Sequence, residues 1–428
     1  MIKRLPAVYP LLFTQIFSLI GSRMTGIAVG IHIFQDTGST APLLIAAFFA
    51  ELPGMVGGTF TGLLADRWDR RHVIILGDAG QAVGTILLMI SFLSGAFQLW
   101  HLYTMMLIQG IFGTIQSPAS DAAITMLVPE ARRDRINGIR SMGFPLAGVI
   151  APVLAGALYS LVGVEGVMAF DLFTFAVAVL VVGLMTIPRP DTSEEAEAMQ
   201  GQFWREMLGG WHYLVARRML LWMVVYISFI YFLINGPLEL AIPYMLSVSG
   251  SEKTLGILLG VMNLGALSGA AAIAILGRMP HRIDVILLGF FALGWVFLLY
   301  GVARHPVLLG MAAFLVLFPL PLIGTLFTTF LQNKTPADLQ GRMFAITGQM
   351  FMLATPFSFL ITAALVDKVL EPAVHRSTWK VFVPLVGRED GAGMGLLLIV
   401  IGLIIIVTTA LFAFIPGIRR LEKDLPSY

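Results

Sequence analysis

The sequence predicts an all-α, polytopic membrane protein with about twelve transmembrane helices, arranged as two six-helix pseudo-repeats. Of its 428 residues, 57% are hydrophobic and only 12% are charged, and the mean hydropathy is +0.87. A soluble domain carries roughly 25% charged residues, so most of this chain faces lipid. Apolar stretches long enough to cross a bilayer core recur along the chain, and several residues recur at one fixed offset.

The apolar stretches fall into two sets on either side of a polar segment. The first set covers residues 7–34, 41–65, 72–95, 101–128, 138–162 and 166–188. The second set covers residues 219–247, 254–277, 283–302, 306–333, 343–366 and 393–416. Many contain Pro or Gly, which membrane helices tolerate. We therefore predict an N-terminal bundle over 1–188, a cytoplasmic linker over 189–218 and a C-terminal bundle over 219–428.

The two halves share a sequence repeat. Pro129, Arg135 and Ile139 follow the fourth stretch, and equivalent residues follow the tenth stretch 207 positions later, at Pro336, Arg342 and Ile346. The same offset carries Gly62 onto Gly269 and Arg71 onto Arg278. A shared offset at two separate loops indicates duplicated halves.

The linker begins acidic and continues with apolar residues at helical spacing, namely Phe203, Trp204, Met207, Leu208, Trp211 and Leu214. One interpretation is an amphipathic helix lying on the inner leaflet. The other is a plain tether between the bundles. The spacing favours the interfacial helix, for which we expect no substrate role.

The basic residues predict the orientation. If the N-terminus is cytoplasmic, 20 of the 27 Lys and Arg residues fall in cytoplasmic segments. The first three outer loops (35–40, 94–100 and 162–166) contain none. This bias predicts a multi-pass protein of a bacterial cell (inner) membrane with both termini cytoplasmic. The segment 367–392 has mixed charge, and we interpret it as a long outer loop.

The stretch 62–71 reads GLLADRWDRR and joins the second and third apolar stretches. Its arginines and aspartates are costly inside lipid, so they must lie at a membrane face. Gly62 permits close helix packing, and Asp66 with Arg70 could form a charge pair that breaks between conformations. Anchoring by arginines alone is the alternative, but it requires neither Gly62 nor Asp66. The pattern favours a gate.

This Gly-x-x-x-Asp-Arg-x-x-Arg-Arg spacing resembles the loop between helices two and three of major facilitator superfamily transporters. The resemblance extends over the whole chain through its spans, central linker and duplicated loops, and it implies the major facilitator fold. It implies a cytoplasmic lock that favours the outward-open state, formed by Asp66, Arg70 and Asp121. The remaining residues of the gate would be Gly62, Arg67 and Arg71.

Two further sequences resemble the branch that contains macrolide-efflux proteins and enterobactin-type siderophore exporters. They are Asp-Arg-Trp-Asp-Arg-Arg over 66–71 and Gln-Gly-Arg-Met-Phe over 340–344. The chain departs from the family at Asp69, where glycine is usual. It also departs at Met106, where proton-coupled members often carry arginine before Gln-Gly.

Two charged residues lie deep within predicted spans. Arg23 is deep in the first and Glu51 lies about ten residues into the second, so both should be near mid-depth. A charge there usually faces a cavity or a partner. Arg23 and Glu51 could form a static salt bridge, or Glu51 could titrate beside Arg23 and couple protons to transport. The sequence leaves both readings open.

Other polar residues are further candidates. Glu239 follows Asn235-Gly236-Pro237, where a helix break is expected, and is a second proton or cation-substrate candidate. Gln109, Gln116 and Asn263 are cavity candidates, although lone amides in membrane helices more often bridge helices. Asp78 and Asp171 lie nearer the faces and are interpreted as packing or capping groups.

Absent motifs exclude other classes of protein. The chain has no cysteine, no Walker-type phosphate loop and no His-Glu-x-x-His zinc motif. No nucleophile and base stand at readable spacing, and the basic residues are scattered through loops. We therefore expect no enzyme activity, cofactor, metal, nucleotide or nucleic-acid partner.

The sequence predicts a secondary active transporter that exports amphipathic small molecules, drug-like or siderophore-like, by alternating access and proton antiport. Its expected partners are the solute, protons and the lipid bilayer, and we expect a monomer. A lysophospholipid or other lipid carrier, or a facilitative importer, would share nearly every feature above.

Overall fold

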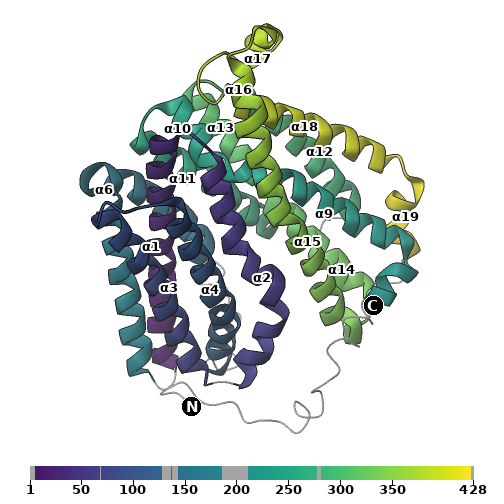
Figure 1. Cartoon of the computed structure of the whole chain (residues 1–428). Coiled ribbons are helices and arrows are strands. Elements are labelled where there is room, and N and C mark those ends of the chain that lie inside the picture. Colours follow the sequence, from purple (N-terminus) through teal and green to yellow (C-terminus); the bar gives the residue numbers. More distant parts are fainter. Residues whose placement is uncertain are drawn as a thin grey trace. The chain divides into compact units, whose positions relative to one another are not determined.

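The computed structural model describes residues 5–67, 69–127, 136, 143–185, 211–276 and 281–425. Within these ranges the regular structure is helical and contains no strand, which confirms the predicted fold class. The chain divides into two compact units (Figure 1). Unit 1 comprises residues 1–191 and 249–260, and unit 2 comprises residues 192–248 and 261–428.

Unit 1 is a bundle of long helices. They are α1 (Leu5–Thr37), α2 (Ala41–Arg67), α3 (Arg70–Leu93), α4 (Leu99–Leu127) and α6 (Gly143–Leu184). α6 packs against α1 and α3, and α4 packs against α2 and α3. Gly163 interrupts α6 with φ 70° and ψ −173°, a conformation that favours glycine. The two predicted spans 138–162 and 166–188 therefore lie on either side of this break.

Unit 2 contains most of the remaining helices. They are α9 (Arg218–Glu239), α10 (Ala241–Ser249), α11 (Glu252–Leu276), α12 (Arg282–Val302), α13 (Pro306–Leu317), α14 (Pro319–Lys334), α15 (Ala337–Leu365), α18 (Ala392–Ala413) and α19 (Pro416–Asp424). α12 packs along α18 and α14, and α9 packs along α15. The first residues of α11, up to Gly260, group with unit 1.

Within the described ranges, each predicted span lies on one of these helices or, for 219–247 and 306–333, on two successive helices. Within the described ranges, nine helices are long and apolar enough to cross a membrane, and α6 holds two of the predicted spans. The span 219–247 is divided at Leu240, where α9 ends and α10 begins. The break expected near Pro237 is thus present, three residues further on. The apolar part of the predicted linker helix, Phe203 to Leu208, lies outside the described residues.

The predicted outer loop 367–392 is folded. It forms the short helices η3 (Val366–Leu370), α16 (Glu371–Val374), η4 (Ser377–Val381) and α17 (Val383–Val386). Trp379 is buried among apolar side chains of this segment and of α18, and its Nε1 donates to the Gly387 carbonyl oxygen at 2.9 Å. Burial of this tryptophan explains why a stretch of mixed charge takes a defined structure.

The C-terminal helix α19 packs against α9, α12 and α18. It buries Ile418 and Leu421, while Arg419 and Arg420 on its other face are exposed. Glu422 pairs with Arg282 of α12 at 3.1 Å. The helix is therefore amphipathic, and its apolar face packs on unit 2.

The core of unit 1 has two apolar clusters at different levels of the bundle. One contains Leu11, Ile74 and Ala123, and the other contains Met24 and Leu88. Between them, α1, α3, α4 and α6 bring polar side chains together. These side chains, here called the polar layer, are Gln15, Ser22, Asp78, Thr85, Gln109, Gln116 and Asp171. The candidate site lies in this layer.

Candidate functional site

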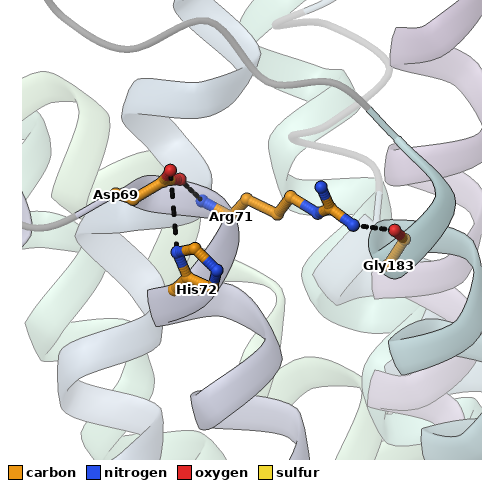
Figure 2. Close-up of polar contacts among 4 residues, drawn as sticks. All are labelled: Asp69, Arg71, His72 and Gly183. Carbon is orange, nitrogen blue, oxygen red and sulfur yellow. Dashed lines mark hydrogen bonds and ion pairs between the residues drawn. The ribbon is translucent and has the colours of Figure 1, made fainter.

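In the second half of the charged loop between α2 and α3, Asp69 makes contacts that stabilise the start of α3 (Figure 2). Asp69 caps the N-terminus of α3, because its Oδ1 accepts the Arg71 backbone N–H at 3.0 Å. Its Oδ2 lies 3.6 Å from His72 Nδ1. Asp69, the position at which the chain departs from the family that this loop resembles, is therefore a helix cap, which typically stabilises a helix by about 1 kcal/mol.

Arg71 connects α3 to the end of α6. Its guanidinium donates to the backbone carbonyl oxygen of Gly183, one residue before α6 ends at Leu184 (Figure 2). Carbonyls in the last turn of a helix lack partners within the helix, and a cation there also interacts favourably with the helix dipole. Arg71 therefore joins two helices of unit 1 and does more than anchor the loop at the membrane face.

The predicted lock is only partly within the described structure. Gly62, Asp66 and Arg67 lie on α2 and Asp121 lies on α4, but their side chains are outside the described residues. Arg70 is half-buried at the first position of α3. The lock of Asp66, Arg70 and Asp121 remains a prediction.

The repeat partner of Gly62 occupies a tightly packed position. A Cβ atom on Gly269 of α11 would lie 1.9 Å from the carbonyl oxygen of Phe318. Only glycine permits this approach of α11 to the α13–α14 region. The close helix packing that was proposed for Gly62 is thus observed at Gly269, its repeat counterpart in unit 2.

Arg23 and Glu51 do not form a salt bridge. The Arg23 guanidinium lies over the Phe144 ring, 3.8 Å from the ring centroid. Glu51 is exposed on α2 and has no ion pair with Arg23 in the described structure. A cation over an aromatic face gains electrostatic attraction without a carboxylate, which explains how Arg23 is accommodated. The static-pair reading is wrong, and the titration of Glu51 remains a prediction.

Two carboxylates that the sequence placed near the membrane faces are instead at the centre of the polar layer. Asp78 on α3 is 1% exposed, and Asp171 on α6 is fully buried. Asp78 accepts hydrogen bonds from Gln116 Nε2 at 2.7 Å and Gln15 Nε2 at 3.4 Å. Both amides belong to other helices, so Asp78 links α1, α3 and α4, as expected for a packing group.

Asp171 has a different set of partners. Its Oδ1 accepts from Ser22 Oγ of α1 at 3.2 Å, and its Oδ2 accepts from Thr85 Oγ1 of α3 at 3.3 Å. Gln109 Nε2 of α4 donates to the same Thr85 hydroxyl at 3.3 Å. Four helices of unit 1 therefore meet at one buried carboxylate through neutral side chains.

The polar layer has a regular spacing that the sequence analysis missed. Its members recur seven residues apart, about two helical turns, on three different helices. These pairs are Gln15 and Ser22, Asp78 and Thr85, and Gln109 and Gln116. Such spacing places both members of a pair on one helix face. Because the spacing can be read from the sequence alone, it could have been used to group these residues.

The remaining candidates have different surroundings. Gln109 and Gln116 bridge helices, as lone amides in membrane helices often do, and both belong to the network around the two carboxylates. Asn263 is half-buried on α11, and Glu239 is exposed at the end of α9. Roles for Asn263 and Glu239 in binding solute or cation remain predictions.

A polytopic helical bundle with a buried polar layer is the architecture of a membrane transporter, and comparisons with known proteins agree. The family model described as Major Facilitator Superfamily matches residues 11–359. The chain belongs to the Major Facilitator Superfamily. It is thus a multi-pass membrane transporter and not an enzyme.

Among curated proteins, the chain is similar to macrolide efflux protein A of Streptococcus pyogenes. The two are 24% identical over 363 residues, which cover 83% of this chain and 88% of the relative. It is also similar to the enterobactin exporter EntS of Salmonella typhimurium, with 26% identity over 349 residues, 80% of this chain and 81% of the relative.

Among solved structures, the chain is similar to a bacterial homologue of the human lysosomal transporter Spinster in an inward-facing and unoccupied conformation. The TM-score is 0.71 with 17% sequence identity, and the match covers 99% of this chain and 98% of the other. A likeness at this identity shows the fold. The resemblance inferred from the charged loop and its branch-specific sequences is confirmed.

Proposed function

We propose that this protein is a secondary active transporter that exports amphipathic small molecules, drug-like or siderophore-like, by alternating access coupled to proton antiport. The observation that carries the proposal is the likeness, over about four-fifths of the chain, to two exporters whose solutes are a macrolide and enterobactin.

Proton coupling requires a titratable group that can change its protonation state within the membrane. The candidates are Glu51, exposed on α2, and the buried Asp171 of the polar layer. Alternating access further requires a cytoplasmic contact that opens and closes, for which Asp66, Arg70 and Asp121 are proposed. The protein would work as a monomer in the bacterial inner membrane.

The test is proton movement in inside-out vesicles that contain the purified chain. A macrolide, a catecholate siderophore or a lysophospholipid is added while a pH-sensitive dye reports the lumen. We expect proton efflux from the acidified lumen only with the transported solute, and little response in Asp66→Asn because the lock is weakened. The exposed outer residue Asp36, changed to Asn, is the matched control and should keep the wild-type response.

Three other results would contradict the proposal in different ways. If macrolide or siderophore enters the vesicles without proton movement, the mechanism is facilitated transport and not proton antiport. A response confined to the lysophospholipid would make the protein a lipid carrier. Absence of transport for every solute class, by vesicles that contain folded protein, would refute export of amphipathic molecules.

A further inference from the structure

The buried carboxylate at the junction of four helices in unit 1 has a role that packing alone does not explain. We infer that Asp171 is the group that binds and releases the coupling proton. This assignment rests on the proton-coupled export proposed above, and it names the site of that coupling. Glu51 and Glu239, which sequence reasoning favoured, would then serve other purposes.

Burial without a compensating charge is the first step of the argument. Asp171 is 0% exposed. The nearest charged residues along the helices around it are Arg23 on α1, Asp78 on α3 and Glu165 on α6. In the described structure none of them forms an ion pair or a hydrogen bond with Asp171, and the Arg23 guanidinium lies over Phe144. A buried carboxylate without a cation is costly, and uptake of a proton removes that cost.

The partners of Asp171 suit both protonation states. Ser22 and Thr85 present hydroxyls, and a hydroxyl can donate or accept. When the carboxyl is ionised, both hydroxyls donate to it. When it is protonated, its O–H donates to Thr85 Oγ1, whose second lone pair still accepts from Gln109. The proton can therefore bind and leave with rotation of hydroxyls only.

Asp78 lacks this property, although it is equally buried. Its partners Gln116 and Gln15 donate through amide N–H groups, which cannot accept. The carbonyl oxygen of Gln116 accepts from Gln81 Nε2, and that of Gln15 accepts from Gln116 Nε2 at 3.4 Å. Both amides are thus held with N–H groups toward Asp78, so these two contacts offer a protonated Asp78 no acceptor. Asp78 is a matched control for Asp171.

The proton needs a path between the buried carboxyl and the surface of unit 1. Ser22 and Gln109 supply the ends of such a path, because both are half-buried while Asp171 and Thr85 are fully buried. Gln109 lies beside Gly110, whose added Cβ would be 2.3 Å from the Ala50 carbonyl oxygen of α2. A change in the protonation state of Asp171 can thus be transmitted through Thr85 and Gln109 to α2, next to Glu51.

The experiment is infrared difference spectroscopy of the purified full-length protein as pH is lowered, which requires no solute. Protonation of a buried carboxyl gives a C=O stretching band distinct from the bands of solvated carboxyls. We expect this band in the wild type, loss of it in Asp171→Asn, and retention of it in Asp78→Asn and Asp36→Asn. A band that persists unchanged in Asp171→Asn would overturn the assignment.

A second variant guards against misfolding of Asp171→Asn. Thr85→Val retains the carboxyl and removes one of its hydroxyl partners, so the band should shift in frequency and its pH midpoint should change. Thr104→Val, at an exposed position of α4, is the control and should change neither. An unchanged band in Thr85→Val would also overturn the assignment.

The spectroscopic and transport experiments test the two proposals separately, so that failure of one can be distinguished from failure of the other. If the band behaves as expected but vesicles show no solute-dependent proton movement, Asp171 binds a proton and the export proposal is wrong. If vesicles show antiport that persists in Asp171→Asn, export stands and the coupling site lies elsewhere.

Discussion

Gly21 sets the space available to Asp171. A Cβ atom at this position of α1 would lie 2.4 Å from Thr174 Oγ1 and 2.9 Å from Asp171 Oδ1. Both atoms belong to α6, and the Asp171 backbone is also close, with its Cα 3.2 Å away. α1 can therefore approach α6 at the polar layer only because residue 21 has no side chain.

We expect Gly21→Ala to destabilise the protein by about 1–3 kcal/mol, the usual cost of overpacking. It should also alter the infrared band assigned to Asp171, because the carboxyl must move. Gly26→Ala on the same helix is the control, since nothing lies within 4 Å of its added Cβ. That substitution should be neutral or slightly stabilising. Thermal unfolding in detergent micelles measures both, and equal stability of the two variants would contradict the prediction.

At the residue scale, the sequence predicted polar partners better than it predicted their grouping. Gln109 and Gln116 were expected to bridge helices, and they do. The sequence could not place Asp171 at the centre, because burial depends on which faces of α1, α3 and α6 meet. It also predicted a pair between Arg23 and Glu51 as one reading, but the sequence does not reveal that Phe144 can satisfy the guanidinium.

At the scale of helices, α11 is defined by its contact with the α13–α14 region. Gly265 and Gly269 lie one helical turn apart, and an added Cβ on either would lie about 2 Å from a backbone carbonyl oxygen, that of Phe314 or Phe318. Because backbone atoms cannot rotate away, a larger residue would displace the whole helix.

We expect Gly269→Ala to lower the melting temperature of the protein and reduce transport, because α11 must shift to relieve the clash. Gly324→Ala on α14 provides the matched control, as its added Cβ would have no neighbour within 4 Å. Thermal unfolding and solute transport by the same vesicles report the two effects. Normal stability of Gly269→Ala would show that α11 is not fixed by this contact.

Hydropathy predicted the long helices well, since in the described ranges each predicted span lies on one helix or on two successive helices, and most ends agree within a few residues. It did not predict the structure of the segment 367–392. There Trp379 is buried among four short helices that also carry charged residues. The dividing points inside spans, at Leu240 and Phe318, depend on local backbone geometry that hydropathy does not record.

At the scale of the whole molecule, the predicted orientation can be tested because the chain contains no cysteine. Any introduced cysteine is the single thiol of the protein. Ser94 and His72 are exposed and lie at opposite ends of α3. They are therefore suitable positions for labelling from the two sides of the membrane.

We expect a membrane-impermeant thiol reagent to label Ser94→Cys in intact cells but to label His72→Cys only after the membrane is permeabilised. The reason is the concentration of basic residues on the His72 side, which predicts a cytoplasmic location. The unmodified protein gives the background. Labelling of His72→Cys in intact cells would invert the proposed topology.

The two apolar clusters of unit 1 bear on proton leakage as well as on packing. The polar layer lies between them, so the proton binding proposed at Asp171 would take place between two groups of buried apolar side chains. A continuous chain of water through both clusters would let protons cross without solute and discharge the membrane. Close packing around Leu11, Ile74, Met24 and Leu88 would oppose such a chain and so conserve the proton gradient that the proposed antiport uses.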